Sequence, residues 1–160
     1  MVKKTHLQFN NYSWDTINLI DYKNVSEKSD IKVTFNNITR QNIITKKDGV
    51  DFEVRLFECG SYGFSTLEKH QHTHIVMIAR GTGKVIIGKN IYDAKPFDFF
   101  IIPEWHPHQL INTAKTPFAF FCTVNAKRDN FKLLSNEEIG QLRKNKDIDK
   151  WVKITEEYKL

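Results

Sequence analysis

Residues 63–83 read GFSTLEKHQHTHIVMIARGTG, so three histidines, at positions 70, 72 and 74, stand directly before a run of apolar residues. The run ends at Arg80 and is followed by two glycines, which is typical of a buried strand that closes in a tight turn. Residues two apart on a strand point to the same side, so histidines at a strand edge can converge on one point. Imidazole is also the commonest metal ligand among side chains. The stretch therefore predicts metal ligands at the start of a buried strand.

A second stretch, residues 97–112, reads FDFFIIPEWHPHQLIN and contributes His106 and His108. Together the two stretches hold five of the six histidines in the chain. They lie about 35 residues apart, and the residues between them have the pattern of several short strands. In a closed barrel, such strands bring the chain back to a point opposite the first cluster. We therefore predict one metal ion bound by side chains from 68–74 and 106–108.

The rest of the central region has the pattern of short strands separated by turns. Asp48-Gly49 lies between two such apolar runs, which is a strong signal for a hairpin. The expected strands are 31–35, 43–44, 52–57, 75–79, 85–87, 91–92, 97–102 and 118–124. This spacing favours an all-β sandwich or barrel. In the last two strands we expect the phenylalanines to pack mainly in the core: Phe97, Phe99, Phe100, Phe118, Phe120 and Phe121.

Both histidine stretches resemble the two signature motifs of the cupin superfamily. In residues 63–83 the resemblance consists of a glycine-containing turn, two candidate ligands one residue apart, a further ligand, and an apolar strand that ends at Gly81. In residues 97–112, Pro103, His108 and Asn112 have a spacing similar to that of the second motif. The resemblance implies a small single-domain cupin. Its fold would be an all-β double-stranded β-helix, or jelly-roll barrel, holding one divalent metal ion.

The resemblance also implies a set of metal ligands. With the register taken from the glycine that ends the apolar strand, the ligands are Glu68, His70 and His74, joined by His108. Glu68 stands where the family usually has a histidine, so His72 is an alternative ligand if the turn between the neighbouring histidines differs. Four such ligands leave one or two positions of the ion open to a small molecule. Iron, manganese, zinc and nickel are all compatible with this set.

An open metal site in a small barrel indicates a function in binding or converting a small chelating molecule. With one carboxylate among its ligands, the site keeps a net positive charge that favours an anionic oxygen or sulfur group. The resemblance implies two classes of function, since its fold hosts both. The first is an enzyme, a dioxygenase, isomerase or lyase, in which His106 or Glu104 moves a proton. The second is a non-catalytic module that binds or senses a small molecule or a metal. We favour the enzyme.

Beyond the predicted barrel at 31–127, we expect an N-terminal arm at 1–30 and a helical tail at 128–160, all within one structural domain. Ser135 and Glu138 form a capping-box pattern that predicts a helix start, and a second helical stretch contains Ile148 and Trp151. Both the arm and the amphipathic tail need a surface to cover. We therefore predict a homodimer.

Composition excludes several other classes. The 160 residues carry a formal net charge of +5, but the lysines are scattered and accompany no nucleic-acid-binding motif, so we expect no nucleic-acid partner. No apolar run approaches the roughly 20 residues that cross a bilayer, and we expect no membrane association. With no signal-peptide pattern at the start, we expect a cytoplasmic location. Cys59 and Cys122 lie in apolar segments, and we expect reduced thiols in the core.

Overall fold

The structure is a computed structural model that describes residues 5–11, 13–14, 17–21 and 35–154. Its elements, in chain order, are β1 (Phe9–Asn10), β2 (Ser13–Trp14), β3 (Leu19–Asp21), β4 (Asn36–Ile44), η1 (Lys46–Asp48), β5 (Phe52–Phe64), β6 (Glu68–Lys69), β7 (His74–Arg80), β8 (Gly83–Ile87), β9 (Asn90–Ala94), β10 (Phe99–Ile102), β11 (His108–Asn112), β12 (Phe118–Asn125), β13 (Lys132–Leu133), α2 (Asn136–Arg143) and α3 (Lys146–Trp151).

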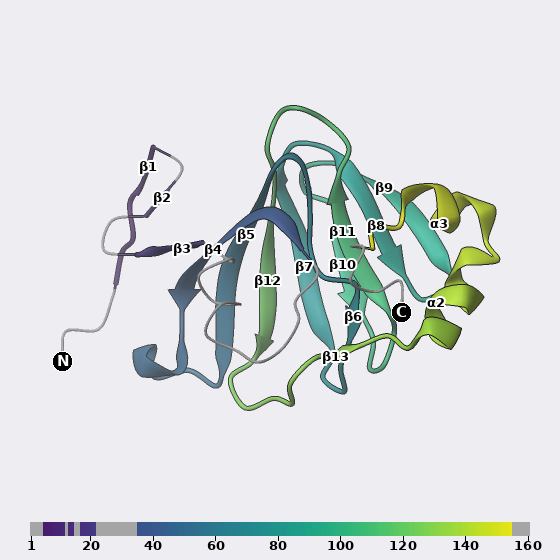
Figure 1. The fold of residues 1–160 in the computed structure, drawn as a ribbon. Coiled ribbons are helices and arrows are strands. Elements are labelled where there is room, and N and C mark those ends of the chain that lie inside the picture. The colour runs from purple at the N-terminus through teal and green to yellow at the C-terminus, as the bar shows by residue number, and fades with distance from the viewer. Residues whose placement is uncertain (1–4, 12, 15–16, 22–34, 155–160) are drawn as a thin grey trace.

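One curled antiparallel sheet forms most of the molecule (Figure 1). Its strands follow the order β10-β7-β12-β5-β11-β6-β13, while β4 joins the sheet beside β5 and β8 lies between β11 and β9. The sheet bends back on itself into a half-barrel, and the two short helices lie together beside β9 (Figure 1). The prediction of an all-β barrel with a short helical tail is therefore confirmed.

The hairpin predicted at Asp48-Gly49 joins β4 to β5. Thr45 caps the short helix η1: its hydroxyl accepts from the Lys47 backbone N–H, and the Asp48 carboxylate accepts from the backbone N–H of Thr45. Gly49 then takes a left-handed conformation with φ of 85°, which glycine adopts without a steric penalty. The cap and the glycine together reverse the chain, so the two strands pair along most of their length.

The turn predicted between β7 and β8 carries the chain from one part of the sheet to another. Strand β7 pairs with β10 and β12, whereas β8 pairs with β9 and β11. Gly81 has a φ of 73°, and a Cβ atom there would lie 2.2 Å from the carbonyl oxygen of Pro117. Only glycine fits this close approach, which fixes the turn against the segment that precedes β12.

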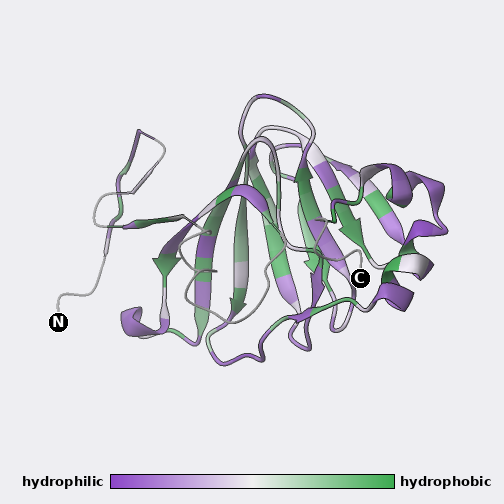
Figure 2. Ribbon diagram, in the orientation of Figure 1, coloured by the Kyte–Doolittle hydropathy of each residue, from purple (hydrophilic) through white to green (hydrophobic). Residues whose placement is uncertain are grey.

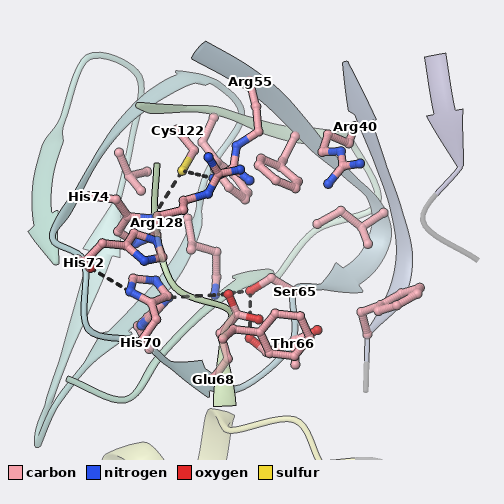
Figure 3. A pocket seen from close by; sticks show the side chains of 18 of the residues that line it. Arg40, Arg55, Ser65, Thr66, Glu68, His70, His72, His74, Cys122 and Arg128 are labelled. Carbon is pink, nitrogen blue, oxygen red and sulfur yellow. Dashed lines mark hydrogen bonds and ion pairs between the residues drawn. The ribbon is translucent and has the colours of Figure 1, made fainter. Parts of the chain in front are cut away.

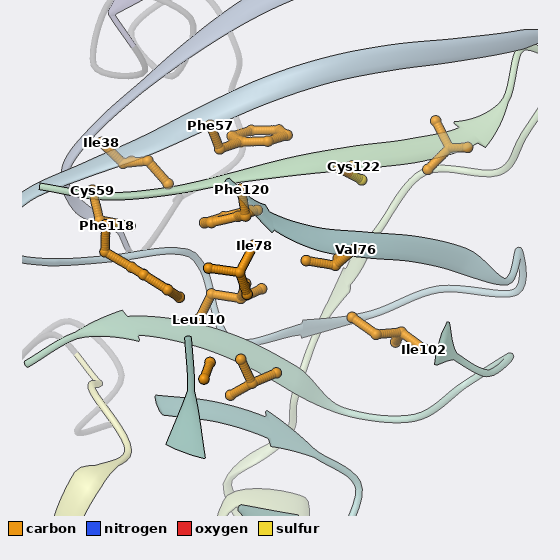
Figure 4. Packing of buried hydrophobic residues seen from close by; sticks show 13 residues of the cluster. Ile38, Phe57, Cys59, Val76, Ile78, Ile102, Leu110, Phe118, Phe120 and Cys122 are labelled. Atoms are coloured by element: carbon orange, nitrogen blue, oxygen red, sulfur yellow. The ribbon is translucent and has the colours of Figure 1, made fainter. Parts of the chain in front are cut away.

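The largest core cluster lies inside the half-barrel, where alternate residues of several strands meet (Figure 4). Hydrophobic residues concentrate on the strands, and hydrophilic ones dominate the two helices (Figure 2). The buried members are Ile38, Phe57, Cys59, Val76, Ile78, Val85, Ala94, Ile102, Leu110, Phe118, Phe120, Cys122 and Val124. Strands β5, β7 and β12 contribute every second residue, as the period of a pleated strand requires.

The expectation that the six phenylalanines pack mainly in the core does not hold for two of them. Phe97 and Phe99 are exposed by 79% and 69%, and Ile101 by 66%. Strand alternation explains Phe99 and Ile101, because β10 turns Phe100 and Ile102 inward and leaves the residues between them facing outward. The outer side of β10 therefore carries an apolar surface that no described residue covers.

The predicted C-terminal helices are present and cover a second buried cluster. Ser135 caps α2 through the capping box with Glu138, and Ile139 and Leu142 of α2 pack with Ile148 of α3. The fully buried Gln109 holds the chain that follows the helices: its amide donates to the carbonyl of Lys153 and accepts from the Lys153 N–H. The tail is thus joined to β11.

The N-terminal segment forms a small hairpin, β1–β2, and one strand, β3, that pairs with β4. Trp14 packs against Phe121 on the outer face of the sheet, with ring centroids 5.8 Å apart. Ile31 and Val33, at the predicted start of the barrel, lie outside the described residues. The boundaries at residues 30 and 127 therefore stay predictions. Among the described residues, no helix has the length and apolar character to span a membrane.

Candidate metal centre

A pocket of about 320 Å³ lies at one end of the half-barrel interior (Figure 3). Both histidine stretches contribute to its wall, as predicted, with His70, His72 and His74 from the first and His108 from the second. Glu68 lines the same pocket. The structure therefore brings together all five residues that the sequence proposed as metal ligands.

Strand pairing places these side chains. Glu68 stands on β6 directly opposite His108, the first residue of β11, and His74 begins β7. The loops beside the strands are tied together, because the Trp105 N–H donates to the His70 carbonyl over 2.7 Å. The two motifs are thus held side by side although they are far apart in the sequence.

Three imidazole rings face one another at nearly equal separations. Ring centroids lie 4.8 Å apart for His70 and His74, 4.7 Å for His70 and His108, and 4.9 Å for His74 and His108. Two overlapping sets have ligand atoms all within 4.8 Å of one another: His70 with His72 and His74, and Glu68 with His70 and His108. Both sets share His70, which lies at the centre of the cluster.

Hydrogen bonds on the far side of two rings fix which nitrogen faces the pocket. The Nδ1 atoms of His70 and His108 lie 2.7 and 2.9 Å from the carbonyl oxygens of His72 and His106. A carbonyl only accepts, so each Nδ1 carries the proton and each Nε2 keeps its lone pair. The Nε2 atoms of His74 and His108 are buried without a hydrogen-bond partner among the described residues. Orphaned lone pairs that converge in this way fit a divalent cation.

The electrostatics of the pocket favour neutral histidines. Burial, together with the neighbouring imidazoles, lowers the pKa of His70 to about 4 and that of His108 to about 3, and the pKa of His74 also falls well below its ordinary value. Metal ligation requires imidazole in this neutral form. Burial raises the pKa of Glu68 to about 7, with Arg55 acting in the opposite direction. A cation among the histidines would favour its ionised form.

His72 is engaged differently from the other three histidines. Its Nδ1 lies 2.6 Å from a carboxylate oxygen of Asp129, whose two oxygens also accept from the backbone N–H groups of Gln71 and His72. Its ring stacks on His70 with centroids 3.7 Å apart. His72 therefore holds the His70 ring between itself and the rest of the cluster, and Asp129 fixes the loop.

One pocket residue was missed by the sequence analysis, which treated both cysteines alike. Both are free and buried, as expected, but Cys122 lines the pocket. Its Sγ lies 3.2 Å from Nδ1 of His74 and 3.3 Å from a terminal guanidinium nitrogen of Arg55. Burial raises the pKa of the Cys122 thiol, and Arg55 acts against that rise. No local signal identifies this cysteine, because its position depends on the pairing of β12 with β7.

Three arginines in the pocket wall were also missed. Arg40 and Arg55 come from β4 and β5, and Arg128 follows β12. Arg128 is paired, since its guanidinium lies 2.8 Å from Glu53 and also donates to the Asn125 carbonyl. For Arg55 the sequence did contain a signal of its position. Arg55 stands two residues before the buried Phe57 on the same strand, so the two side chains share the inward face.

Glu104 and His106 do not reach the pocket. Both are exposed on the loop before β11, and neither belongs to the pocket wall. The Nδ1 of His106 donates to the carbonyl of Glu104 over 3.0 Å, which is a contact within the loop. Their predicted role in proton transfer thus has no support from a contact with the site, and it stays a prediction.

The fold and the cluster together define a small barrel whose histidines converge on a candidate divalent-metal site. Residues 59–124 match the family model of the cupin domain. A curated relative, 1-methylthio-D-xylulose 5-phosphate methylsulfurylase of Rhodospirillum rubrum, is 36% identical over 132 residues, which cover 82% of this chain and 81% of the relative. The chain therefore belongs to the cupin superfamily.

Solved structures support the same assignment. The crystal structure of a cupin-2 domain from Rhodospirillum rubrum matches with a TM-score of 0.78 and 34% identity, covering 88% of this chain and 90% of the other. A cupin 2 conserved barrel domain protein from Rhodopseudomonas palustris matches with a TM-score of 0.80 and 32% identity, covering 92% and 97% of the two chains. The recognition of a small cupin from its two motifs is confirmed.

Proposed function

We propose that this chain is a metal-dependent enzyme that removes the methylthio group from a methylthio-substituted ketose phosphate. The substrate class is the one in the name of the Rhodospirillum rubrum relative, 1-methylthio-D-xylulose 5-phosphate. The observation that carries the proposal is the thiol of Cys122 beside His74, in the same pocket as the converging histidines. A thiol that can take up a methylthio group and a cation site that can bind a ketone oxygen are the two parts such a reaction needs.

In this proposal the metal is held by His70, His74, His108 and Glu68. The His72 ring stacks on His70 and holds it in place. When bound, the metal supplies Lewis-acid chemistry, polarising the ketone oxygen next to the carbon that carries sulfur. Iron, manganese, zinc and nickel all remain compatible with these ligands. The proposal thus narrows the predicted action on a small chelating anion to cleavage of a carbon–sulfur bond next to a carbonyl.

Cys122 acts as the sulfur acceptor. Its Sγ attacks the methylthio sulfur, so a sulfur–sulfur bond forms as the bond between that sulfur and carbon 1 of the sugar breaks. The electron pair of the broken bond stays on carbon 1, which takes up the thiol proton and becomes a methyl group. The sugar is reduced and Cys122 is oxidised to a methyl disulfide. A low-molecular-weight thiol must then exchange with this disulfide to restore the Cys122 thiol.

His74 and Arg55 position the thiol. With Nε2 of His74 turned to the metal, its Nδ1 carries the proton and donates to the sulfur of Cys122, 3.2 Å away. Arg55 donates to the same sulfur over 3.3 Å. Two donors on one sulfur stabilise the thiolate, which is the nucleophilic form of cysteine. Arg55 in addition makes the pocket attractive to an anionic substrate.

The test is turnover of 1-methylthio-D-xylulose 5-phosphate by the metal-loaded protein with a small thiol present. We expect loss of the methylthio group from the sugar. Without the small thiol, intact-mass measurement should find one methylthio group on Cys122. Cys122→Ser should lower the rate at least about 10³-fold, because serine cannot accept sulfur in this way. Cys59→Ala is the matched control, since Cys59 lies in the core away from the pocket, and its rate should stay near wild type.

Three outcomes would overturn the proposal. Wild-type turnover in Cys122→Ser would exclude the thiol as acceptor. Substrate-dependent oxygen uptake would favour the dioxygenase among the predicted enzymes. Tight binding of the sugar phosphate with no turnover would favour a non-catalytic sensor.

A further inference from the structure

The rings of His70 and His72 are nearly parallel, whereas the other rings of the cluster cross at steep angles. The His70 and His72 planes are inclined by only 7°, with centroids 3.7 Å apart. The planes of His70, His74 and His108 are inclined to one another by 63° to 81°. The lone pair of an imidazole nitrogen lies in the ring plane, so a bound ion lies in that plane, about 2 Å from the nitrogen. The inclination of two rings therefore decides whether they can share one ion.

His72 cannot share an ion with His70 in this arrangement. Two nearly parallel planes in van der Waals contact do not meet within the pocket, so an ion in the plane of one ring lies outside the plane of the other. His72 and His74 are nearly perpendicular, but their centroids are 6.2 Å apart. Imidazole ligands of one ion, with bond angles of about 90–110°, have centroids roughly 4.5–5 Å apart. The separations of 4.7 to 4.9 Å among His70, His74 and His108 lie in this range.

Asp129 holds the His72 ring in its stacked position. One carboxylate oxygen of Asp129 lies 2.6 Å from Nδ1 of His72 and also accepts from the His72 backbone N–H over 3.1 Å. The other oxygen accepts from the backbone N–H of Gln71 over 2.8 Å. A carboxylate accepts from all three groups, so Nδ1 is the donor to it. One side chain therefore fixes both the backbone and the ring of His72.

The segment that carries Asp129 is itself anchored at the start of β5. The Ala126 N–H donates to the carbonyl of Asp51 over 2.9 Å, and the guanidinium of Arg128 lies 2.8 Å from the carboxylate of Glu53. The carboxylate of Asp129 thus reaches the histidine loop from a segment whose own position is fixed.

We infer that Asp129 is a positioning residue for the metal centre, and that His72 gives the ion no ligand atom. Asp129 acts on His70 through His72, which restrains the His70 ring twice: the two rings stack, and the His72 carbonyl accepts from Nδ1 of His70 over 2.7 Å. Groups that orient a ligand in this way contribute to metal affinity without touching the metal. The inference rests on the proposed metal ligands, but not on the proposed reaction.

The test measures Zn²⁺ affinity by competition with a chromogenic chelator, together with the visible spectrum of the Co²⁺-loaded protein, which depends on the number and kind of ligands. Asp129→Ala should bind Zn²⁺ about 10- to 100-fold more weakly than wild type. Asp129→Asn should lose less affinity, because its amide oxygen still accepts part of the bonds. Asp147→Ala is the matched control, since it removes an aspartate at an exposed site on α3, and its affinity should equal that of wild type.

His72→Phe separates a ring that stacks from a ring that ligates. Phenylalanine keeps a flat ring against His70 but has no nitrogen for a metal or for Asp129. We expect its Zn²⁺ affinity to fall by no more than about tenfold and its Co²⁺ spectrum to keep its form. The same substitution at a proposed ligand, His70→Phe, should lower Zn²⁺ affinity by about 10²- to 10³-fold and change the spectrum.

Two results would overturn the inference while the proposed ligands stand. One is a loss of Zn²⁺ binding in His72→Phe as large as that in His70→Phe, which would make His72 a ligand. The other is wild-type Zn²⁺ affinity in Asp129→Ala, even with a lower melting temperature, since a merely structural role produces that pattern. Unchanged affinity in His70→Phe would instead overturn the proposed ligand set and the inference with it. None of these measurements uses substrate, so failure of the proposed reaction is seen separately.

Discussion

The two ends of the barrel interior are built from the same strands but have opposite chemistry. We call the pocket side of the interior the polar end; it contains Arg55, His74, His108 and Cys122. We call the opposite side the apolar end, where three of these strands contribute Cys59, Ile78 and Phe118. Along each of these three strands, the polar and the apolar side chain stand four positions apart, so both point inward.

The difference shows how one short barrel divides stability from function. The apolar end buries side chains that need no partner, and it holds the strands in register. The polar end buries three imidazoles and a thiol, groups that are unfavourable in a core unless they have partners or bind a ligand. The two cysteines show this difference between the ends. Cys59 packs in the apolar core, whereas Cys122 faces the histidines of the pocket.

The largest effect should come from the polar end. His108→Ala removes one of the converging Nε2 atoms and should abolish stoichiometric metal binding, measured by mass spectrometry of the metal content, while circular dichroism shows a folded barrel. Turnover should fall at least about 10³-fold with it. His106→Ala, at an exposed neighbouring position, is the control and should keep its metal. Full metal content in His108→Ala would mean that the proposed ligand set is wrong.

At the apolar end, a comparable truncation should affect stability and not metal binding. Ile78→Ala leaves a cavity in the tightly packed core and should lower the free energy of unfolding by about 2–5 kcal/mol, measured by urea denaturation. Ile75→Ala, on the outward face of the same strand, should lower it much less. The contrast between the two ends would fail if Ile78→Ala lost its metal while still folded.

The polar end should also make the metal-free protein sensitive to acid. The buried histidines have pKa values below the 6.5 of the unfolded chain, at about 4 for His70 and about 3 for His108. The unfolded state therefore binds protons first as the pH falls below 6.5, and stability decreases. Glu68, with its pKa raised to about 7, has the opposite and smaller effect, since three histidines outnumber it.

The net loss between pH 7 and pH 5 should be a few kcal/mol, measured from denaturation midpoints of the chelator-treated protein. In His108→Asn the loss should be smaller by roughly half, because one of three titrating histidines is gone while Glu68 still acts in the opposite direction. If His108→Asn loses as much stability between pH 7 and pH 5 as the wild type, His108 does not contribute to the acid sensitivity.

Substitutions on the outer face of β10 should have the smallest effect on the pocket. Phe99 and Ile101 project from β10, and such an exposed apolar surface is typical of a protein interface. If the predicted homodimer forms through this face, Phe99→Asp with Ile101→Asp should shift the sedimentation coefficient to that of a monomer and leave metal binding unchanged. Phe52→Asp, at an exposed site on β5, is the control. A compact monomer in the wild type would refute the homodimer.

Local sequence signals predicted the elements whose physics is local. The hairpin at Asp48-Gly49 and the capping box of Ser135 with Glu138 were both correct, because a few neighbouring residues satisfy the backbone there. The histidine spacing also predicted that His70, His72 and His74 lie together, since they are two to four residues apart within one motif. The errors and omissions concern residues whose environment comes from distant strands: Phe99 on the outer face, Cys122 in the pocket, and the arginines of the hairpin.

The sequence by itself therefore determined a cupin barrel, its turns and caps, and the side chains able to bind a metal. Only the tertiary structure decided which of them share a pocket with the Cys122 thiol and the Arg55 guanidinium. The physical reason is strand pairing. Cys122 reaches His74, 48 residues earlier in the chain, because β12 lies between β5 and β7. The period of a strand gives two faces, but only its neighbours decide what each face meets.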